Sequence, residues 1–134
     1  MFIPRGATIA VADGEKLNLF RNSGDEIHPR LVPQTYEDVA NDNAGSGARH
    51  ISSAANPDAS QLEEDDFASG VAELLNGHVL DGRISQLIVI AAPRTLGELR
   101  KRYHQKLSEV LLAEIPKDLT GHTVDDVARA IASV

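Results

Sequence analysis

Alternation of apolar and polar residues near the start of the chain predicts a β-hairpin. In "TIAVADGEKLNLFRN", two apolar runs flank the pair Asp13-Gly14, which favours positive φ and is typical of a tight hairpin turn. We expect strands over about 8–13 and 16–21. A third run, "IHPRLVPQTYEDV", contains Pro29 and Pro33, and it suits an edge strand because proline donates no ladder hydrogen bond. The chain is predicted to begin with three antiparallel strands.

Helical spacing replaces this alternation in the middle of the chain. The apolar residues that form one helix face are Phe67, Val71, Leu74 and Leu75. Ser60 and Glu63 have the spacing of a capping box, so we expect a helix that begins near Gln61 and stops at Gly82. Four acidic residues after the cap suit the positive end of the helix dipole.

The segment "LIVIAAPRTLGELRKRYHQK", residues 87–106, joins the most apolar stretch to the densest positive charge. Its continuous apolar start predicts a strand covered on both faces, at the centre of the sheet. Thr95 and Glu98 have the spacing of a second capping box, so a helix is expected directly beyond Pro93-Arg94. Arg94 then lies at a strand-to-helix turn, where open α/β sheets bind ligands and where helix N–H groups favour anions.

The remaining residues predict a helix, an edge strand and a last helix. We expect a helix over about 104–113 with Leu107, Val110 and Leu111 facing inward, and an edge strand over about 112–117. Thr123 and Asp126 cap the final helix. The resulting order, β-β-β-α-β-α-β-α, is that of the ribonuclease H-like fold. We therefore predict one α/β domain over residues 1–134, with three antiparallel strands followed by alternating helices and strands.

Residues 41–60 contain almost only small and polar side chains, and Ile51 is the one large apolar residue among them. Such a composition cannot build a core, which favours a mobile connector over a functional loop. In the second interpretation, Arg49 and His50 contact RNA phosphate from this loop.

Composition narrows the class of protein. The chain has 134 residues, 42% of them hydrophobic and 25% charged, as in ordinary soluble globular domains. It contains no cysteine, which excludes a disulfide framework and a thiolate zinc site. There is no apolar leader after Met1, and the longest apolar run is too short to cross a membrane, so we expect a cytoplasmic protein without membrane insertion.

The net charge of −7 disfavours a nucleic acid wrapped over the whole surface, but the positive charge is concentrated. Residues 94–106 hold five cations and one carboxylate, a net charge of +4, against −11 for the remainder. One interpretation is a solvated helix whose cations balance the acidic helix at 63–66, with Arg94 paired to Glu63 or Asp66. The other is a surface that binds phosphate, RNA or an acidic protein. Its residues are Arg94, Thr95, Arg100, Lys101, Arg102 and Lys106. Tyr103 is the sole aromatic residue in this window, which favours phosphate contact over base stacking.

Four segments of the chain resemble a known family. They are "VADGEKLNLFRN", "LEEDDFASGVAELLN", "LIVIAAPRTLGELRKRYHQKL" and "EIPKDLTGH". They resemble the bacterial host attachment protein family, which is similar to the middle domain of archaeal and eukaryotic class 1 release factors. The resemblance implies a ribonuclease H-like fold and a ribosome-related role. Those factors cleave peptidyl-tRNA with a Gly-Gly-Gln loop, whereas "GSGARH" at the comparable place has no glutamine, so this reaction is not expected.

No catalytic set of residues is predicted. Ribonuclease H-type catalysis needs carboxylates on the first strand and at the end of the fourth, but Asp13 lies in a turn and the fourth strand ends in Ala92-Pro93. The five histidines lack metal-binding spacing, and we expect no metal and no cofactor. The predicted function is a non-enzymatic module that contacts RNA, the ribosome or the translation machinery. The alternative is an attachment or signalling factor that binds protein. The sequence defines no oligomeric state.

Overall fold

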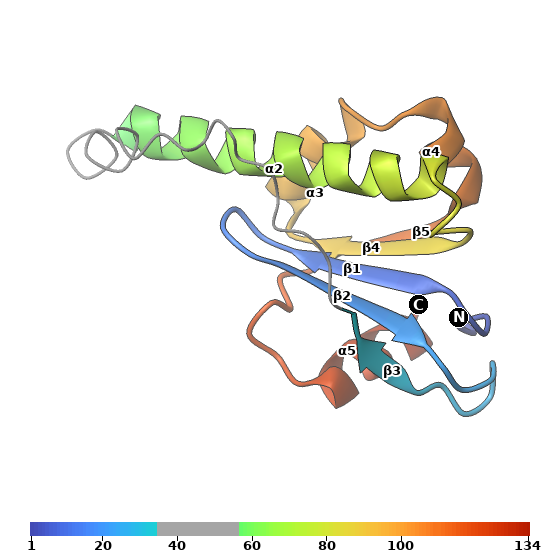
Figure 1. Ribbon diagram of the computed structural model, residues 1–134. Coiled ribbons are helices and arrows are strands. Elements are labelled where there is room, and N and C mark those ends of the chain that lie inside the picture. Colours follow the sequence, from blue (N-terminus) through green and yellow to red (C-terminus); the bar gives the residue numbers. More distant parts are fainter. Residues whose placement is uncertain (35–56) are drawn as a thin grey trace.

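The computed structural model describes residues 1–34 and 57–134, which form a five-stranded mixed sheet with helices on both faces (Figure 1). The strands are β1 (Thr8–Ala12), β2 (Leu17–Asn22), β3 (Leu31–Pro33), β4 (Leu87–Ala91) and β5 (Leu111–Pro116). Their order across the sheet is β3-β2-β1-β4-β5. The first three strands are antiparallel, whereas β4 is parallel to both β1 and β5. The predicted antiparallel start and the two predicted edge strands are therefore confirmed.

The β1–β2 hairpin is closed by a side chain and not by a glycine conformation. Four residues separate Ala12 from its partner Leu17. The Asp13 Oδ1 atom accepts hydrogen bonds from the backbone N–H groups of Glu15 and Lys16, both at 2.6 Å. Gly14 does not have positive φ. The predicted hairpin is confirmed, but the positive φ expected for Asp13-Gly14 is not found, because an aspartate side chain that bonds to the following backbone offers another way to turn the chain.

Four helices cover the sheet within the described residues. They are α2 (Pro57–Leu80), α3 (Pro93–Arg100), α4 (Gln105–Val110) and α5 (Val124–Ala132). Helices α2, α3 and α4 lie on one face and α5 lies on the other (Figure 1). The predicted α/β class with a mixed sheet is confirmed. Between β4 and β5 the chain forms the two short helices α3 and α4, which are joined by a turn.

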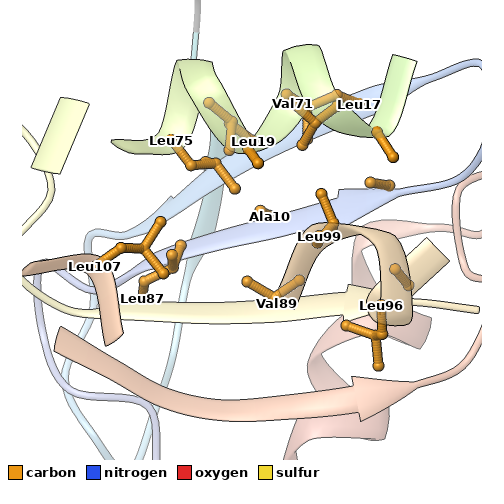
Figure 2. Packing of buried hydrophobic residues seen from close by; sticks show 14 of the residues in the cluster. Ala10, Leu17, Leu19, Val71, Leu75, Leu87, Val89, Leu96, Leu99 and Leu107 are labelled. Atoms are coloured by element: carbon orange, nitrogen blue, oxygen red, sulfur yellow. The ribbon is translucent and has the colours of Figure 1, made fainter. Parts of the chain in front are cut away.

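Both faces of the two inner parallel strands are buried. Alternate residues of β1 and β4 point to opposite sides, so each strand contributes to two apolar clusters. On the side shown in Figure 2, Ala10 and Val89 lie beneath Leu75 and Leu99. On the other side, isoleucines of β1 and β4 pack with Val127. The predicted two-sided cover of β4 is confirmed, although β1 is the middle strand of the five.

Two predicted helix starts are wrong. Helix α2 begins at Pro57, so Ser60 lies inside the helix and cannot be its N-cap. Proline suits a first helical position because its missing N–H would have no intrahelical partner there. Residues 57–60 of the predicted loop are therefore helical, while Arg49 and His50 lie outside the described residues. Helix α3 begins after Ala92 with no side-chain cap.

The predicted helix over 104–113 is also wrong at its end. Helix α4 stops at Val110, and Leu111 pairs with Leu87 as the first residue of β5. Strand pairing next to β4 thus overrides the helical spacing of the apolar residues. The predicted stop at Gly82 is confirmed by its φ of 81°. The predicted cap of the last helix is confirmed by the Thr123 side chain, which accepts a hydrogen bond from the Asp126 N–H at 3.1 Å.

Asn22 is the buried polar centre of the β2–β3 connection. Its amide donates to the Ile3 carbonyl at 2.9 Å, and its Oδ1 atom accepts from the N–H groups of Gly24 at 2.9 Å and Arg30 at 2.8 Å. The backbone is tightly folded here, since a Cβ added to Gly24 would lie 2.2 Å from the His28 carbonyl oxygen. This side chain therefore joins the segment before β1 to both ends of the loop.

Candidate functional site

Helix α3 places the predicted site at the carboxyl end of β4. It begins two residues after the strand, and its buried residues Leu96 and Leu99 fix it against the sheet and α2 (Figure 2). The other residues of this short helix are exposed or half-buried. The predicted strand-to-helix turn after β4 is confirmed, but Arg94 is the second residue of α3 and not part of the turn.

Arg94 leans toward the acidic start of α2. Its Nη2 atom lies 3.9 Å from the Asp65 Oδ1 atom, and 61% of the arginine side chain is exposed. An exposed pair at that distance contributes little stability. Asp65 adjoins Asp66, one of the two partners considered for the structural interpretation. Pro93 has no N–H, so the backbone donors that remain at the helix start are those of Arg94 and Thr95.

The other cations of the window are mostly paired with carboxylates. Arg100 Nε lies 2.8 Å from Glu114, Lys101 Nζ lies 2.7 Å from Glu98, and Lys106 Nζ lies 3.8 Å from Glu109. In the described part of the chain, Arg102 has no ion pair. Four of the five cations thus contact one carboxylate each, so the cluster has a net charge of +1 in place of the +4 of the sequence window. Three of these carboxylates lie outside that window.

Arg100 and Tyr103 attach the end of α3 to strand β5 through one carboxylate. Glu114, whose side chain is 18% exposed, accepts from Arg100 Nε at 2.8 Å and from the Tyr103 hydroxyl at 3.3 Å. Burial, together with the Glu114 charge, raises the pKa of Tyr103 well above its ordinary value. Arg100 therefore has a structural partner, which separates it from the other predicted binding residues.

Asn76 of α2 holds the backbone on both sides of Tyr103. Its Nδ2 atom donates to the Arg102 carbonyl at 2.9 Å, and its Oδ1 atom accepts from the His104 N–H at 2.8 Å. The His104 ring then accepts from the Lys106 N–H and caps α4. We call residues 101–106 the basic turn. Its backbone is fixed from below, while the side chains of Lys101, Arg102 and Lys106 remain exposed.

Sequence reasoning did not find Asn76 or Glu114. Each lies outside the charged window and meets it only in the folded chain, 26 residues before Arg102 and 14 residues after Arg100. No local spacing links these residues to the cations. We call them positioning residues, because their partly buried side chains bond to the turn and to the end of α3.

Asp13, the first carboxylate considered for metal-dependent catalysis, is occupied by structural bonds. Partial burial raises its pKa, but hydrogen bonds from the Glu15 N–H, the Thr120 hydroxyl and the Lys16 N–H outweigh this effect and leave the pKa lowered. The Thr120 bond is 2.8 Å long and joins the loop after β5 to the hairpin turn. Across residues 1–34 and 57–134, no three histidine or acidic side chains are arranged to hold a metal ion. None of the helices described is both long and apolar enough to span a membrane.

Comparison with known proteins identifies the family. Bacterial archaeo-eukaryotic release factor family 12 matches residues 6–131. The chain belongs to this family. The release-factor resemblance of the sequence is therefore confirmed over nearly the whole chain, including the basic turn and both positioning residues. The name host attachment does not occur in this match and stays a prediction.

A curated relative of this family 12 chain is known from a bacterium. It is the "Uncharacterized protein RP470" of Rickettsia prowazekii (strain Madrid E), which is 41% identical over 49 residues. Those residues cover 37% of the family 12 chain and 33% of the relative. The chain thus spans about a third of that relative.

The segment "GSGARH", compared above with the release-factor loop, lies outside the described residues.

Alkaline pH tests the Tyr103–Glu114 contact in this family 12 protein. Because the pKa of Tyr103 is raised on folding, the stability that its protonated hydroxyl provides is complete below the unfolded value of about 10 and is lost above it. Tyr103→Phe should cost about 1 kcal/mol of unfolding free energy at pH 7. The wild-type advantage should then fall by about 1.4 kcal/mol per pH unit above pH 10. Urea unfolding of both proteins from pH 7 to 11 measures this, and a difference that stays constant with pH would contradict it.

Proposed function

We propose that the chain is a single ribonuclease H-like domain that binds the translation machinery in the cytoplasm and contacts RNA phosphate through the basic turn. Membership of a release factor family over residues 6–131 carries the translation part of the proposal. The strand order β3-β2-β1-β4-β5, with antiparallel first strands and parallel last strands, supports the ribonuclease H-like topology.

The observation that carries the RNA contact is the unpaired Arg102 on a fixed backbone. In the part of the chain that the structure describes, this arginine has no carboxylate partner, and Asn76 fixes its carbonyl at 2.9 Å. Lys101 and Lys106 flank it, and each forms an i,i+3 pair in which the lysine side chain is mostly exposed. Phosphate can displace the carboxylates of exposed pairs because such pairs contribute only about 0–1 kcal/mol. The planar guanidinium of an arginine presents several N–H donors to a phosphate group.

Arg94 and Thr95 form a second, weaker contact in this proposal. They lie at the opposite end of α3, about 10 Å from Lys101 along the helix axis at 1.5 Å per residue. The Arg94 pair with Asp65 is long and exposed, so its guanidinium is available to an anion at low cost. Arg100 is left out, because its bond to the mostly buried Glu114 is structural.

Sedimentation with ribosomes over a salt series tests the proposal. If phosphate contacts hold the protein, the bound fraction should fall steeply between about 50 and 200 mM salt, because each contact releases counterions. The purified protein is incubated with ribosomes, pelleted and measured at each salt concentration. Failure to pellet at low salt, or binding that does not change with salt, would contradict RNA phosphate as the ligand. The second result would favour an apolar protein interface.

A further inference from the structure

We propose that the basic turn binds the phosphate backbone of double-helical RNA and not the bases of a single strand. This inference rests on the proposed function and names the class of RNA that the turn accepts. Three features of the described residues support it: the absence of a stacking surface, the short extent of the positive charge, and the fixed backbone.

The basic turn offers no row of aromatic rings to the bases of a strand. Tyr103 is its sole aromatic residue, and the hydroxyl of this largely buried side chain is bonded to Glu114. Of the other aromatic residues within the described ranges, Phe20 and Phe67 belong to the two apolar clusters. Phe2 is 70% exposed, but it follows Met1, whose amino group bonds to α5 beneath the opposite face of the sheet. Proteins that bind single strands stack successive bases on aromatic side chains. The basic turn exposes one such ring, that of His104, which cannot stack successive bases.

The positive charge of the turn is short and bounded by carboxylates. Glu98 lies 2.7 Å from Lys101 at one end, and Glu109 lies 3.8 Å from Lys106 at the other. A single strand follows a continuous positive groove, which these carboxylates interrupt. A double helix holds its phosphates at fixed spacings, so a compact patch can contact a few of them. Charge complementarity therefore fits the backbone of a duplex.

The turn is also rigid enough to match fixed phosphates. Asn76 bonds to the backbone before and after Tyr103, at 2.9 and 2.8 Å, and the Tyr103 hydroxyl is bonded from below. A preorganised surface loses little conformational entropy on binding a rigid partner, whereas a flexible strand must still be ordered. The arrangement favours the partner that is already ordered.

Fluorescence anisotropy with two labelled RNAs tests the inference on the full chain. One probe is a duplex of about 16 base pairs, the length that shape-reading modules span, and the other is oligouridine of the same number of nucleotides. We expect the duplex to bind about tenfold more tightly at equal salt. Arg102→Ala should weaken duplex binding about five- to tenfold and lower the slope of log affinity against log salt by about one. Arg30→Ala, an exposed arginine between β2 and β3, serves as the matched control and should change binding less than about twofold.

The outcomes separate this inference from the function on which it rests. Oligouridine bound as tightly as the duplex, with ribosome sedimentation retained, would overturn the inference alone. Loss of affinity for both RNAs together with absent sedimentation would overturn both proposals. Poly-glutamate that displaces the duplex at equal charge would overturn the inference by showing that the turn accepts acidic polypeptides equally well.

Discussion

Replacing Lys101 and Arg102 together with glutamate should weaken ribosome binding on the order of 100-fold. Each removed charge-assisted contact is worth about 1.5–3 kcal/mol, and two of them reach that factor even at the lower bound. The new carboxylates would also repel phosphate beside Glu98, which already lies in contact with Lys101. Sedimentation at low salt, where wild-type binding is strongest, measures the loss.

Stability should hardly change in the same double variant. Both side chains are exposed, and the single ion pair that is lost belongs to the class worth about 0–1 kcal/mol. A control with Arg5→Glu and Lys16→Glu makes the same change in net charge at the two ends of β1, where both side chains are exposed. Equal losses of binding in the two double variants would show that net charge, and not the basic turn, governs the interaction.

Asn22→Ala should be the most destabilising polar substitution among those considered, at about 3 kcal/mol. It removes the donor to the buried Ile3 carbonyl and the acceptor for the N–H groups of Gly24 and Arg30. A buried group left without a partner costs about 1–3 kcal/mol, and this substitution removes the partner of three backbone groups. For a chain of this size the midpoint of thermal unfolding should fall by about 10 °C.

Asn18→Ala on the same strand is the matched control for Asn22. The Asn18 side chain is half-buried and donates one longer bond, to the Thr120 carbonyl at 3.3 Å. Its loss should cost less than about 1 kcal/mol. Differential scanning calorimetry compares both variants with the wild type. Similar midpoints for the two variants would show that the bonds of Asn22 do not hold the loop together.

The distribution of apolar residues by itself determined most of the fold. Continuous burial of β4 followed from its uninterrupted run over Leu87–Ala91, and the prolines at positions 33 and 116 placed β3 and β5 at the edges. The stop of α2 at Gly82 and the cap at Thr123 followed from backbone preferences of single residues. These features depend on neighbours in the sequence, so a local pattern is sufficient to predict them.

Tertiary structure decided the boundary between α4 and β5, whereas the helix starts follow a local preference of proline. Ser60 and Thr95 both begin a capping-box pattern, yet both lie inside helices that start earlier, at Pro57 and Pro93. Leu111 has helical spacing with Leu107, but the pairing of β5 with β4 takes it into the sheet. Proline at the first helical position explains the two helix starts. At Leu111, helix and strand have similar free energies, and contact with a distant strand selects the strand.

The sequence determined one part of the basic turn, and the tertiary structure determined the rest. The sequence alone placed Lys101, Arg102 and Lys106 close together, because they are neighbours along the chain. Only the folded structure brought Asp65 and Glu114 to the cations and Asn76 to the backbone. A count of charges within one window cannot include carboxylates that approach from other elements. The tertiary structure therefore reduced a cluster of five cations to one unpaired arginine on a fixed turn, because ion pairs form through space and not along the sequence.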